Sequence, residues 1–281
     1  SSFILLKGCF DMSSEIASTD TVRTFQYGDN LKVKIEQNDC ISFLRSLDDE
    51  SIDLIVTDPA YSGMNNKLQL GKGRIVGEYK QKGTENGKWF AEFEDSEDNY
   101  HVFLQECKRV LKKDTGHIYI MFDSFSLLSL GHLVRDHFDV KNLITWDKVN
   151  MGMGHYFRRR HEYIIFATNG NNRNIRNRSF PDVWRFKRIH NAKYPTQKPV
   201  ELFQAMIYAS AEQGFTVCDP FLGSGSSAIA AMINNCHFIG CDIAERSIQA
   251  ANERIQHFIE KNEDIFQPKP SYIEGEKIFW Q

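Results

Sequence analysis

The sequence predicts an α/β fold with a mostly parallel sheet and helices on both of its faces. Seven apolar segments of strand length alternate with segments whose apolar residues recur at helical spacing. Chains with this pattern form parallel sheets that are buried on both faces. The predicted strands are residues 31–36, 52–57, 116–122, 140–146, 162–168, 216–219 and 237–242, and the predicted helices are residues 41–47, 99–112, 125–138, 199–209, 226–233 and 244–260.

The helices are predicted from the spacing of their apolar residues. Ile41, Leu44 and Leu47 fall on one face of the first helix, and the second helix repeats the same spacing. Pro199 suits the first turn of the fourth helix, because the N–H that proline lacks would have no helical partner there. Each helix is therefore expected to bury one apolar face against the sheet.

Two of the predicted strands end in an acid followed by a proline. The strand at residues 52–57 is followed by Asp58-Pro59-Ala60-Tyr61. The strand at residues 216–219 runs into the string Asp219-Pro-Phe-Leu-Gly-Ser-Gly. Ligands of parallel sheets bind beyond the carboxyl ends of the strands, so both strings are candidate sites.

The composition is that of an ordinary globular protein. Hydrophobic residues make up 41% and charged residues 25% of the chain, and the net charge is −3. No apolar stretch approaches the ~20 residues needed to cross a membrane, and the start of the chain lacks the features of a signal peptide. The six cysteines are scattered without a Cys-x-x-Cys pair, which predicts a reduced, cytoplasmic protein with neither a zinc site nor disulfides.

Two segments are poor in apolar residues and rich in basic ones. Residues 62–88 hold six glycines and six basic residues against two acids, and residues 158–193 hold ten basic residues against two acids. Aromatic residues and asparagines, which stack on bases or read their edges, are interleaved with the charges of the second segment. A nucleic-acid-binding face is favoured over the alternative, a solvated basic loop. The candidate contacts are Lys72, Arg74, Lys80, Lys82, Arg158, Arg159, Arg160, Arg173, Arg176, Arg178, Arg185, Lys187 and Arg188.

The string that begins at Asp219 has the features of a site for a nucleoside-containing cofactor. Gly223 and Gly225 permit a tight turn and a close approach of the backbone to a ligand. The next predicted strand ends in Asp242, an acid that can accept the hydroxyls of a ribose. The string also fits the dinucleotide fingerprint, so a nicotinamide cofactor and a plain glycine turn both stay open here. The absence of a following Lys-Ser or Lys-Thr excludes a Walker loop.

The string from Asp58 to Tyr61 suits chemistry on a planar amine. The lone pair of an exocyclic amine is delocalised into its base, so the amine is a poor nucleophile. A carboxylate and a backbone carbonyl that accept its two N–H groups bias it toward tetrahedral geometry, and a stacked ring fixes the base. Asp58 supplies the carboxylate, Pro59 a stiffened turn and a carbonyl, and Tyr61 the ring. A base inside a duplex would have to be flipped out to reach them. An ordinary Asp-Pro turn at a strand end is the structural alternative.

Together, the two strings and the segments between them resemble the beta class of S-adenosylmethionine-dependent DNA amino-methyltransferases, in which the catalytic region precedes the cofactor region. The similarity covers most of residues 32–256 and follows the family order through five motifs. It implies a seven-stranded Rossmann-like methyltransferase sheet with a circularly permuted motif order, and S-adenosylmethionine as the cofactor. The motifs are Asn38-Asp-Cys with Asp53-Leu-Ile-Val-Thr-Asp-Pro-Ala-Tyr, Phe103-Leu-Gln-Glu-Cys-Lys-Arg-Val-Leu-Lys, Arg160-His-Glu-Tyr-Ile-Ile-Phe-Ala, Tyr194-Pro-Thr-Gln-Lys-Pro-Val-Glu-Leu and the Asp219 string.

The resemblance implies a role for each matching position. Asp58, Pro59, Ala60 and Tyr61 would engage the target base, and Thr196 and Lys198 would approach the methionine end of the cofactor. Residues 158–193 overlap the region where the family recognises its target, and the loop after Tyr61 would close over DNA. The implied cofactor-binding residues are Asp39, Cys40, Asp58, Thr196, Lys198, Asp219, Phe221, Gly223, Ser224, Gly225, Ser226, Ser227, Asp242 and Ile243.

Three positions depart from the family pattern. Ala60 stands where a second proline is usual, which loosens the turn and adds an N–H, and we expect activity to survive with an altered rate or target. Ser227 stands where threonine is frequent, and Tyr194 stands where histidine is usual. The initial Asp58, rather than serine, favours adenine N6 over cytosine N4. Methylation at cytosine carbon-5 is disfavoured because the chain has no Pro-Cys pair.

The leading hypothesis is a site-specific DNA adenine-N6 methyltransferase that acts on a flipped-out base. The alternatives are a cytosine-N4 methyltransferase, a methyltransferase on RNA or a protein amide, a non-catalytic DNA-binding subunit with the same fold, and, more distantly, a nicotinamide oxidoreductase. The resemblance leaves open a homodimer and a cognate restriction endonuclease as partners beside DNA, and implies a nucleoid-associated protein. The predicted organisation is an N-terminal extension (1–30), a methyltransferase domain (31–265) with an inserted loop (62–98) and a basic target-recognition segment (about 150–195), and a C-terminal tail (266–281).

Overall fold

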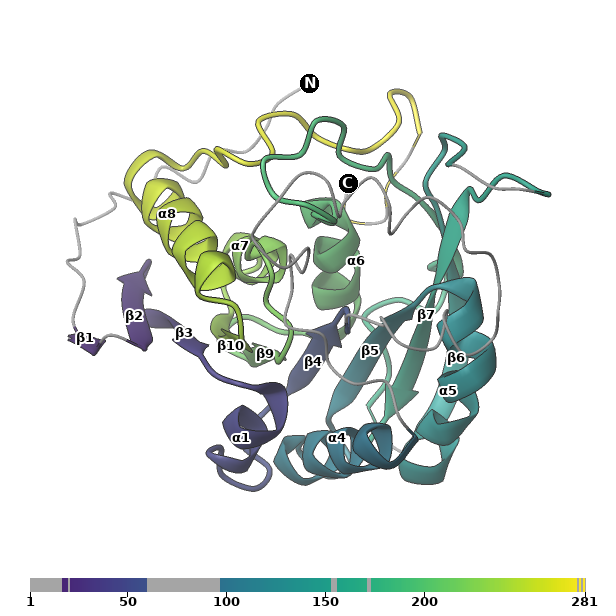
Figure 1. The fold of residues 1–281 in the computed structure, drawn as a ribbon, viewed down its shortest axis with the longest axis horizontal. Helices are drawn as coiled ribbons and strands as arrows, with labels where there is room; N and C mark the ends of the chain where they lie inside the picture. The colour runs from purple at the N-terminus through teal and green to yellow at the C-terminus, as the bar shows by residue number, and fades with distance from the viewer. Residues whose placement is uncertain are drawn as a thin grey trace, which may run out of the picture.

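The computed structural model describes residues 17–19, 21–59, 97–152, 156–170, 173–276, 278 and 280. Within these residues, ten strands form one sheet in the order β1-β2-β3-β10-β9-β4-β5-β7-β6-β8 (Figure 1). The strands are β1 (Ala17–Thr19), β2 (Val22–Tyr27), β3 (Leu31–Gln37), β4 (Leu54–Thr57), β5 (His117–Phe122), β6 (Asp139–Asp147), β7 (His161–Thr168), β8 (Val183–Arg185), β9 (Thr216–Asp219) and β10 (His237–Asp242).

All seven predicted strands are present, and the α/β fold with a mostly parallel sheet is confirmed. Five neighbouring strands, β3, β10, β9, β4 and β5, run parallel to one another. The strand β7 lies antiparallel between β5 and β6. The predicted count of seven is too low, because the sheet also includes β1, β2 and β8. Two of these added strands are only three residues long, too short to show a sequence period.

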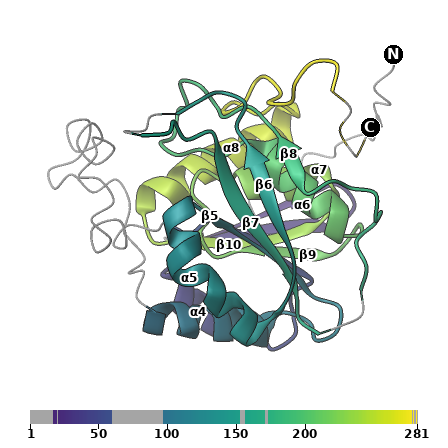
Figure 2. The ribbon, with the colours of Figure 1, turned by 90° about the vertical axis from the view of Figure 1, so that its right-hand side faces the viewer.

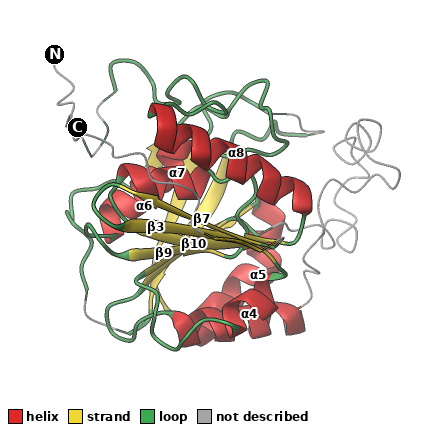
Figure 3. Ribbon diagram, turned by 90° about the vertical axis from the view of Figure 1, so that its left-hand side faces the viewer, coloured by secondary structure: helices red, strands yellow, loops and turns green. Residues whose placement is uncertain are grey.

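The six described helices cover both faces of the sheet, as the alternating pattern predicts. Figure 3 shows α6, α7 and α8 on one face and α4 and α5 on the other. Each helix lies within two residues of its predicted bounds at either end. The helices are α1 (Cys40–Arg45), α4 (Glu97–Val110), α5 (Ser124–His137), α6 (Val200–Ser210), α7 (Ser226–Ile233) and α8 (Glu245–Lys261).

Alternation along the strands divides the interior into two cores. In β4, Leu54 and Val56 pack in the core with α6, α7 and α8, whereas Ile55 packs in the core with α1, α4 and α5. In β5, Tyr119 packs in the first core and Ile118 in the second. Side chains of successive strand residues point to opposite faces, so a continuous apolar run is what a doubly covered sheet requires.

Both predicted flanking segments contribute to the packed unit. Phe25 and Tyr27 of β2 are buried in the first core. Ser271 donates its backbone N–H (3.0 Å) and its hydroxyl (2.6 Å) to the buried carboxylate of Glu201 on α6. The domain boundaries at residues 31 and 265 stay predictions, and packing continues across both. None of the described helices is both long and apolar enough to span a bilayer.

The strand directions define two edges of the sheet. At the carboxyl edge, Asp58 follows β4, Asp123 follows β5, and β9 and β10 end in Asp219 and Asp242. Since β7 is antiparallel to β5, its first residue, His161, also lies at this edge. The opposite, amino edge holds the start of β5, the start of β9 and the end of β7. Figure 2 shows β6, β7 and β8 side by side. The strand order places them at the other end of the sheet from β1.

Candidate active site

The centre of the carboxyl edge is an ion pair between Asp58 and Lys198. Asp58 comes directly after β4, and Lys198 directly precedes Pro199, the N-cap of α6. The Lys198 ammonium donates to Oδ2 of Asp58, and the two side chains are 16% and 25% exposed. Among the described residues, Oδ2 of Asp58 is held by Lys198 and Oδ1 accepts no hydrogen bond.

A second carboxylate lies on the far side of Lys198. Oε2 of Glu162 is 3.8 Å from Lys198 Nζ, and its Oε1 accepts from Lys148 Nζ at 2.9 Å. The four residues form a row of alternating sign, Asp58, Lys198, Glu162 and Lys148, which we call the charge chain. Opposite charges at these distances stabilise one another strongly where water is largely excluded.

The charge chain sets the protonation of its members. Burial raises the pKa of Asp58, and Lys198 opposes this shift. Burial disfavours the charge of Lys198, yet Asp58 and Glu162 raise its pKa above the ordinary value. Burial alone would raise the pKa of Glu162. The positive charges of Lys198 and Lys148 outweigh burial, so the pKa lies below its ordinary value. Lys198 therefore favours the ionised form of Asp58 against the effect of burial.

Neither Glu162 nor Lys148 was predicted as a site residue. Glu162 is one of the two acids among the ten basic residues of segment 158–193. Its partner Lys148 lies beyond the end of β6, and the antiparallel pairing of β6 with β7 brings the two together. An isolated acid at the start of a strand inside a basic segment was the available signal.

Two residues with unfavourable backbone conformations flank the lysines of the charge chain. Val149 has φ 66° and Thr196 has φ 57°. Both residues are β-branched, and such residues in the left-handed region cost roughly 1–3 kcal/mol each. Strain of this kind persists where surrounding contacts impose it, and here the two strained residues lie beside Lys148 and near Lys198.

The predicted cofactor loop forms a glycine turn between β9 and α7. Gly223 and Gly225 have φ of 52° and 82°, a region that favours glycine. A side chain at Gly223 would meet no atom within 4 Å, so the space in front of this residue is open. Asp242 holds the turn, because its Oδ2 accepts from Gly223 N at 2.9 Å and its Oδ1 from Ala244 N at 2.9 Å.

The polar side chains of the loop point into the protein. The Ser227 hydroxyl donates to Oδ2 of Asp219 at 2.6 Å, and the Ser226 hydroxyl donates to the Lys198 carbonyl at 2.8 Å. Burial raises the pKa of Asp219 to about 7, against the effect of the Ser227 hydrogen bond. Ser224 is also buried. Cofactor contacts by these hydroxyls stay a prediction, and the structure gives them the role of holding the loop.

The ends of β3 and β10 offer an apolar surface beside polar groups. Asp39 is the N-cap of α1, and its Oδ1 accepts from Ile41 N (3.1 Å) and Ser42 N (2.9 Å). Cys40 is buried behind it, and Ile243, after Asp242, is 47% exposed. An exposed isoleucine next to an acid and a helix N-terminus is suited to cover one face of a purine. Phe221, in the cofactor loop, packs edge-on against Phe103 at 5.6 Å.

The basic residues predicted to contact DNA are divided between the two edges. Arg160 donates to both oxygens of Asp147 (2.6 and 2.7 Å), and Arg185 donates to one of them (3.3 Å), all at the carboxyl edge. Arg160 lowers the pKa of Asp147 to about 2. Two cations therefore share this carboxylate. Arg158, Lys187 and Arg188 are exposed, and the guanidinium of Arg159 lies 4.7 Å from the centre of the Phe125 ring.

The structure places two of the predicted contacts at the amino edge. Arg173 donates to the carbonyls of Thr115 (2.7 Å) and Ser210. Arg176 donates to the carbonyls of Tyr208 (2.8 Å) and Ala211 (2.9 Å) at the end of α6. Both arginines cap the carboxyl end of α6, where free carbonyls need donors. The structure does not bring them together with Asp58, and Arg178, which contacts Asn174 at 3.2 Å, lies in the same stretch of chain.

The loop between β6 and β7 adds two aromatic residues that were not predicted. Tyr156 and Phe157 are 90% and 95% exposed and directly precede Arg158. Exposed aromatic rings beside arginines suit stacking on bases. The signal was present, since a Tyr-Phe pair directly precedes three consecutive arginines. The predicted residues Ala60, Tyr61, Lys72, Arg74, Lys80 and Lys82 lie outside the described part of the chain.

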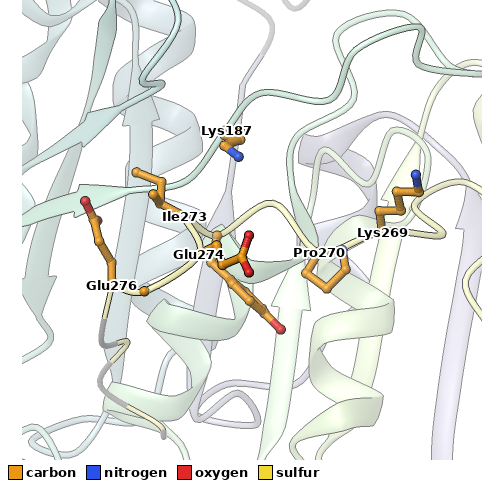
Figure 4. A pocket seen from close by; sticks show the side chains of 8 residues that line it. Lys187, Lys269, Pro270, Ile273, Glu274 and Glu276 are labelled. Atoms are coloured by element: carbon orange, nitrogen blue, oxygen red, sulfur yellow. The ribbon is translucent and has the colours of Figure 1, made fainter.

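A surface hollow on the C-terminal segment is a separate feature. It has a volume of about 680 Å³ and is lined by residues 269–270 and 272–276 together with Lys187 (Figure 4). Glu274 and Glu276 line it together with Lys187 and Lys269, so its charges balance. It contains none of the residues predicted for catalysis or the cofactor. The carboxyl edge is thus the better candidate for chemistry.

The family model described as "DNA methylase", for N6 and N4 methylases, matches residues 52–253. The chain belongs to the N6/N4 DNA methylase family. Its match begins just before β4 and ends within α8, so it includes Asp58, the charge chain and the cofactor loop. The resemblance inferred from the motifs is thereby confirmed at the level of the family.

Curated relatives cover almost the same length of chain. The type II methyltransferase M2.DpnII of Streptococcus pneumoniae is 28% identical over 263 residues, which are 85% of this chain and 95% of the relative. The type II methyltransferase M2.MboI of Moraxella bovis is 28% identical over 244 residues, covering 79% of this chain and 86% of the relative. The similarity is therefore not restricted to one motif.

Solved methylase structures share the fold. The complex of M1.HpyAVI with S-adenosylmethionine has a TM-score of 0.55 at 20% identity and covers 79% of this chain and 99% of that one. The Thermus thermophilus protein TTHA0409 with S-adenosyl-L-methionine has a TM-score of 0.57 at 19% identity, covering 81% and 96%. The cytosine-N4-specific PvuII methyltransferase has a TM-score of 0.59 at 14% identity, covering 81% and 90%.

S-adenosylmethionine is the cofactor of this DNA methylase, and the carboxyl edge fits it. The open space at Gly223 admits a ligand against the backbone of the loop, and exposed Ile243 offers an apolar face for an adenine. The cofactor supplies a methyl group activated by a sulfonium. The methylase would hold it between the Gly223 turn, Asp242 and the N-terminus of α1.

Proposed function

We propose that this methylase transfers a methyl group to the N6 amine of adenine at a specific DNA sequence, as the modification enzyme of a type II restriction system. The observation that carries the proposal is the half-occupied Asp58 carboxylate at the carboxyl edge. Lys198 holds Oδ2, so Oδ1 is available for one N–H of a planar amine. The names of the relatives M2.DpnII and M2.MboI support the type II assignment.

In this proposal, the residues of the chain act by positioning and by holding a proton. Oδ1 of Asp58 accepts one amine N–H, the carbonyl of Pro59 accepts the other, and Tyr61 stacks on the base. These contacts draw the nitrogen lone pair out of the ring. As the nitrogen gains the methyl group it loses one proton, which passes to Asp58 and then to water. Lys198 keeps Asp58 ionised before transfer, and Glu162 keeps Lys198 in place.

Adenine is proposed over cytosine because the catalytic string begins with aspartate. A carboxylate suits the exocyclic amine of either base, because it accepts hydrogen bonds and cannot donate one, so the preference for adenine rests on the resemblance. Serine at this position, which the sequence lacks, is the variant associated with cytosine N4 in the resemblance described above. The second N–H acceptor and the aromatic ring are the same for both bases.

The proposed DNA surface is the part of the carboxyl edge formed by the loop before β7 and the residues after β8. It comprises Tyr156, Phe157, Arg158, Arg159, Arg160, Arg185, Lys187 and Arg188. Its cations supply the sequence-independent phosphate attraction, and its aromatic and asparagine neighbours are candidates to read bases.

Sequencing modified bases in a host plasmid tests the proposal. The protein is expressed in cells that lack other DNA methylases, and the plasmid is sequenced by a method that distinguishes N6-methyladenine from N4-methylcytosine. We expect N6-methyladenine at one recurring motif, and no marks when the Asp58→Ala variant is expressed. N4-methylcytosine would refute the choice of base. Absence of marks from a folded protein that binds S-adenosylmethionine would refute methylation of DNA under these conditions.

A further inference from the structure

Arg254 on α8 is fully buried although it carries a charge. Its side chain has no exposed surface, whereas most charged residues of α8 lie on its outer side. Burying an unpaired guanidinium is costly, so the surroundings must supply both charge and hydrogen bonds. Asp264, just beyond the end of α8, provides a two-pronged partner, with Nε to Oδ1 at 2.8 Å and Nη2 to Oδ2 at 2.7 Å. The Phe266 ring covers the guanidinium at 5.4 Å.

The remaining nitrogen of Arg254 points to the cofactor loop. Its Nη1 donates to the Ser226 hydroxyl at 2.9 Å and to the Ser224 carbonyl at 3.1 Å. It also lies 3.3 Å from the Ser224 hydroxyl. The guanidinium fork thus faces Asp264 on one side and the loop on the other. A lysine ammonium, as a single point of donation, cannot span both partners in the same way.

The Ser226 hydroxyl extends this contact toward the catalytic carboxylate. A hydroxyl has one proton, and that of Ser226 goes to the carbonyl of Lys198 at 2.8 Å. The oxygen must therefore accept from Arg254, which fixes the direction of both hydrogen bonds. Lys198 in turn donates from its ammonium to Asp58. A continuous path runs from Arg254 through Ser226 and Lys198 to Asp58.

The C-terminal segment closes the other side of the same path. Gln197, next to Lys198, donates to the carbonyl of Phe266 at 3.1 Å. The amide of Gln267 donates to Glu201 and accepts from Val200 N at 2.8 Å. The segment that supplies Asp264 to Arg254 therefore also holds the residues on either side of Pro199. The start of α6 and the cofactor loop are fastened to the same strip of chain.

We propose that Arg254 is a positioning residue that fixes the cofactor loop and, through Ser226, the backbone of Lys198. The proposal rests on the assignment of the Gly223–Gly225 turn to S-adenosylmethionine. Arg254 touches neither reactant, and its effect reaches them through the loop and through Lys198. Asp264 keeps the guanidinium oriented.

The test compares Arg254→Lys with a matched variant on the same helix. Ile255→Val removes one methylene from the next residue, which is fully buried in the first core and contacts neither loop nor Asp264 by a polar group. It lowers Tm without removing the guanidinium. For wild type and both variants, binding of S-adenosylhomocysteine is measured by calorimetry, and kcat and KM for S-adenosylmethionine are measured with saturating DNA.

For Arg254→Lys we expect at least a tenfold weaker binding of S-adenosylhomocysteine, a similar rise in KM and a fall in kcat. For Ile255→Val we expect the affinity for S-adenosylhomocysteine, KM and kcat all to stay within twofold of wild type, at a temperature where all proteins are folded. Ser226→Ala, a smaller change, should lower kcat more than it raises KM, because Ser224 still contacts Arg254 while the link to Lys198 is lost. It serves as the second test if Arg254→Lys does not fold.

The outcomes separate the inference from the proposed function. Wild-type protein that binds no S-adenosylhomocysteine would overturn both the site assignment and the inference. Wild-type binding together with unchanged affinity, KM and kcat in Arg254→Lys would overturn the inference alone. Equal changes in KM for Arg254→Lys and Ile255→Val would also overturn it, because the effect would then follow stability and not the loop.

Discussion

At the carboxyl edge, Lys198 donates to one oxygen of the Asp58 carboxylate, and the other oxygen accepts no hydrogen bond from the described residues, whereas at the amino edge Arg173 and Arg176 donate to backbone carbonyls at the end of α6. Both edges contain buried titratable groups and basic residues. At the carboxyl edge the polar atoms face a glycine turn with open space, and at the amino edge they complete the hydrogen bonds of α6. The direction of the strands thus decides which charged residues are available to a substrate.

The amino edge also contains a buried triad of polar residues that resembles a catalytic arrangement. His117 Nε2 lies 2.8 Å from the carbonyl of Arg173, so Nε2 carries the proton and donates. Its Nδ1 then accepts from the Ser210 hydroxyl at 2.8 Å, and Ser210 accepts from Tyr119 at 2.7 Å. All three side chains are buried, which gives them a structural role. Similar residue types are therefore poor evidence of chemistry without access for a substrate.

The largest effect is expected from Asp58→Ala, which removes the carboxylate proposed to accept the target amine. Methyl transfer should fall on the order of 10³-fold, because electrostatic positioning of the amine is lost. The affinity for S-adenosylmethionine should change little, since the cofactor loop is held by Asp242 and Arg254. Single-turnover transfer of a radiolabelled methyl group and calorimetry measure the two quantities. A rate near that of wild type would show that the carboxyl edge works without this residue.

The next effect concerns the stability of the amino edge as pH changes. Burial, with a contribution from Arg173, lowers the pKa of His117 to about 4. The unfolded chain binds this proton below about pH 6.5 and the folded chain only below about 4, so His117 makes the fold less stable as pH falls through this window. The loss amounts to roughly 3 kcal/mol by pH 4. Urea unfolding from about pH 7.5 to about pH 4 measures this loss.

His117→Gln provides the control for this pH dependence, because glutamine does not titrate. Other buried groups titrate in the same range, including Asp219 at the carboxyl edge, whose pKa is raised to about 7. The difference in unfolding free energy between wild type and variant isolates the histidine. That difference should shrink as pH falls, because protonation of His117 in the unfolded chain destabilises wild type, whereas glutamine in the variant takes up no proton. A difference independent of pH would contradict the neutral, buried state of His117.

Lys198→Met should reduce activity by about tens of fold at neutral pH and alter its pH dependence. Burial raises the pKa of Asp58, and Lys198 is the main group that opposes the shift. Without the lysine the pKa of Asp58 rises further, and Asp58 must be ionised to accept the amine. Activity should therefore be lost at a higher pH as the solution is acidified. A profile of kcat against pH identical to that of wild type would show that Lys198 does not control this carboxylate.

The sequence was sufficient for the seven predicted strands and the helices because their signals are local. Apolar periodicity predicts strand and helix positions without knowledge of what they pack against. The pairing of Lys198 with Asp58 joins residues 140 positions apart and depends on the sheet order, which no local signal encodes. The inward orientation of Ser226 likewise involves Arg254, a charged residue on the buried face of α8 that lies 28 positions away in the sequence.

The basic segment at residues 158–193 could not be divided into DNA-binding and structural residues from composition alone. All ten of its basic residues contribute equally to a net charge of +8, so sequence alone could not separate them. The antiparallel direction of β7 does so, because it places the residues just before His161 at the carboxyl edge and the residues soon after Thr168, such as Arg173 and Arg176, at the amino edge. Arg159 and Arg176 are thus matched in chemistry and opposed in position.

The smallest effect, about tenfold in DNA affinity, is expected from reversing the charge of Arg159 and not from the same change at Arg176. Arg159→Glu places a negative charge on the proposed DNA surface, which should weaken binding and reduce its dependence on salt. Arg176→Glu should leave affinity nearly unchanged and lower Tm, because it removes the donors that cap α6. Fluorescence anisotropy with a labelled duplex at several salt concentrations, alongside thermal unfolding, measures both proteins. Equal losses of affinity would place DNA at both edges, and a loss confined to Arg176→Glu would move the DNA surface to the amino edge.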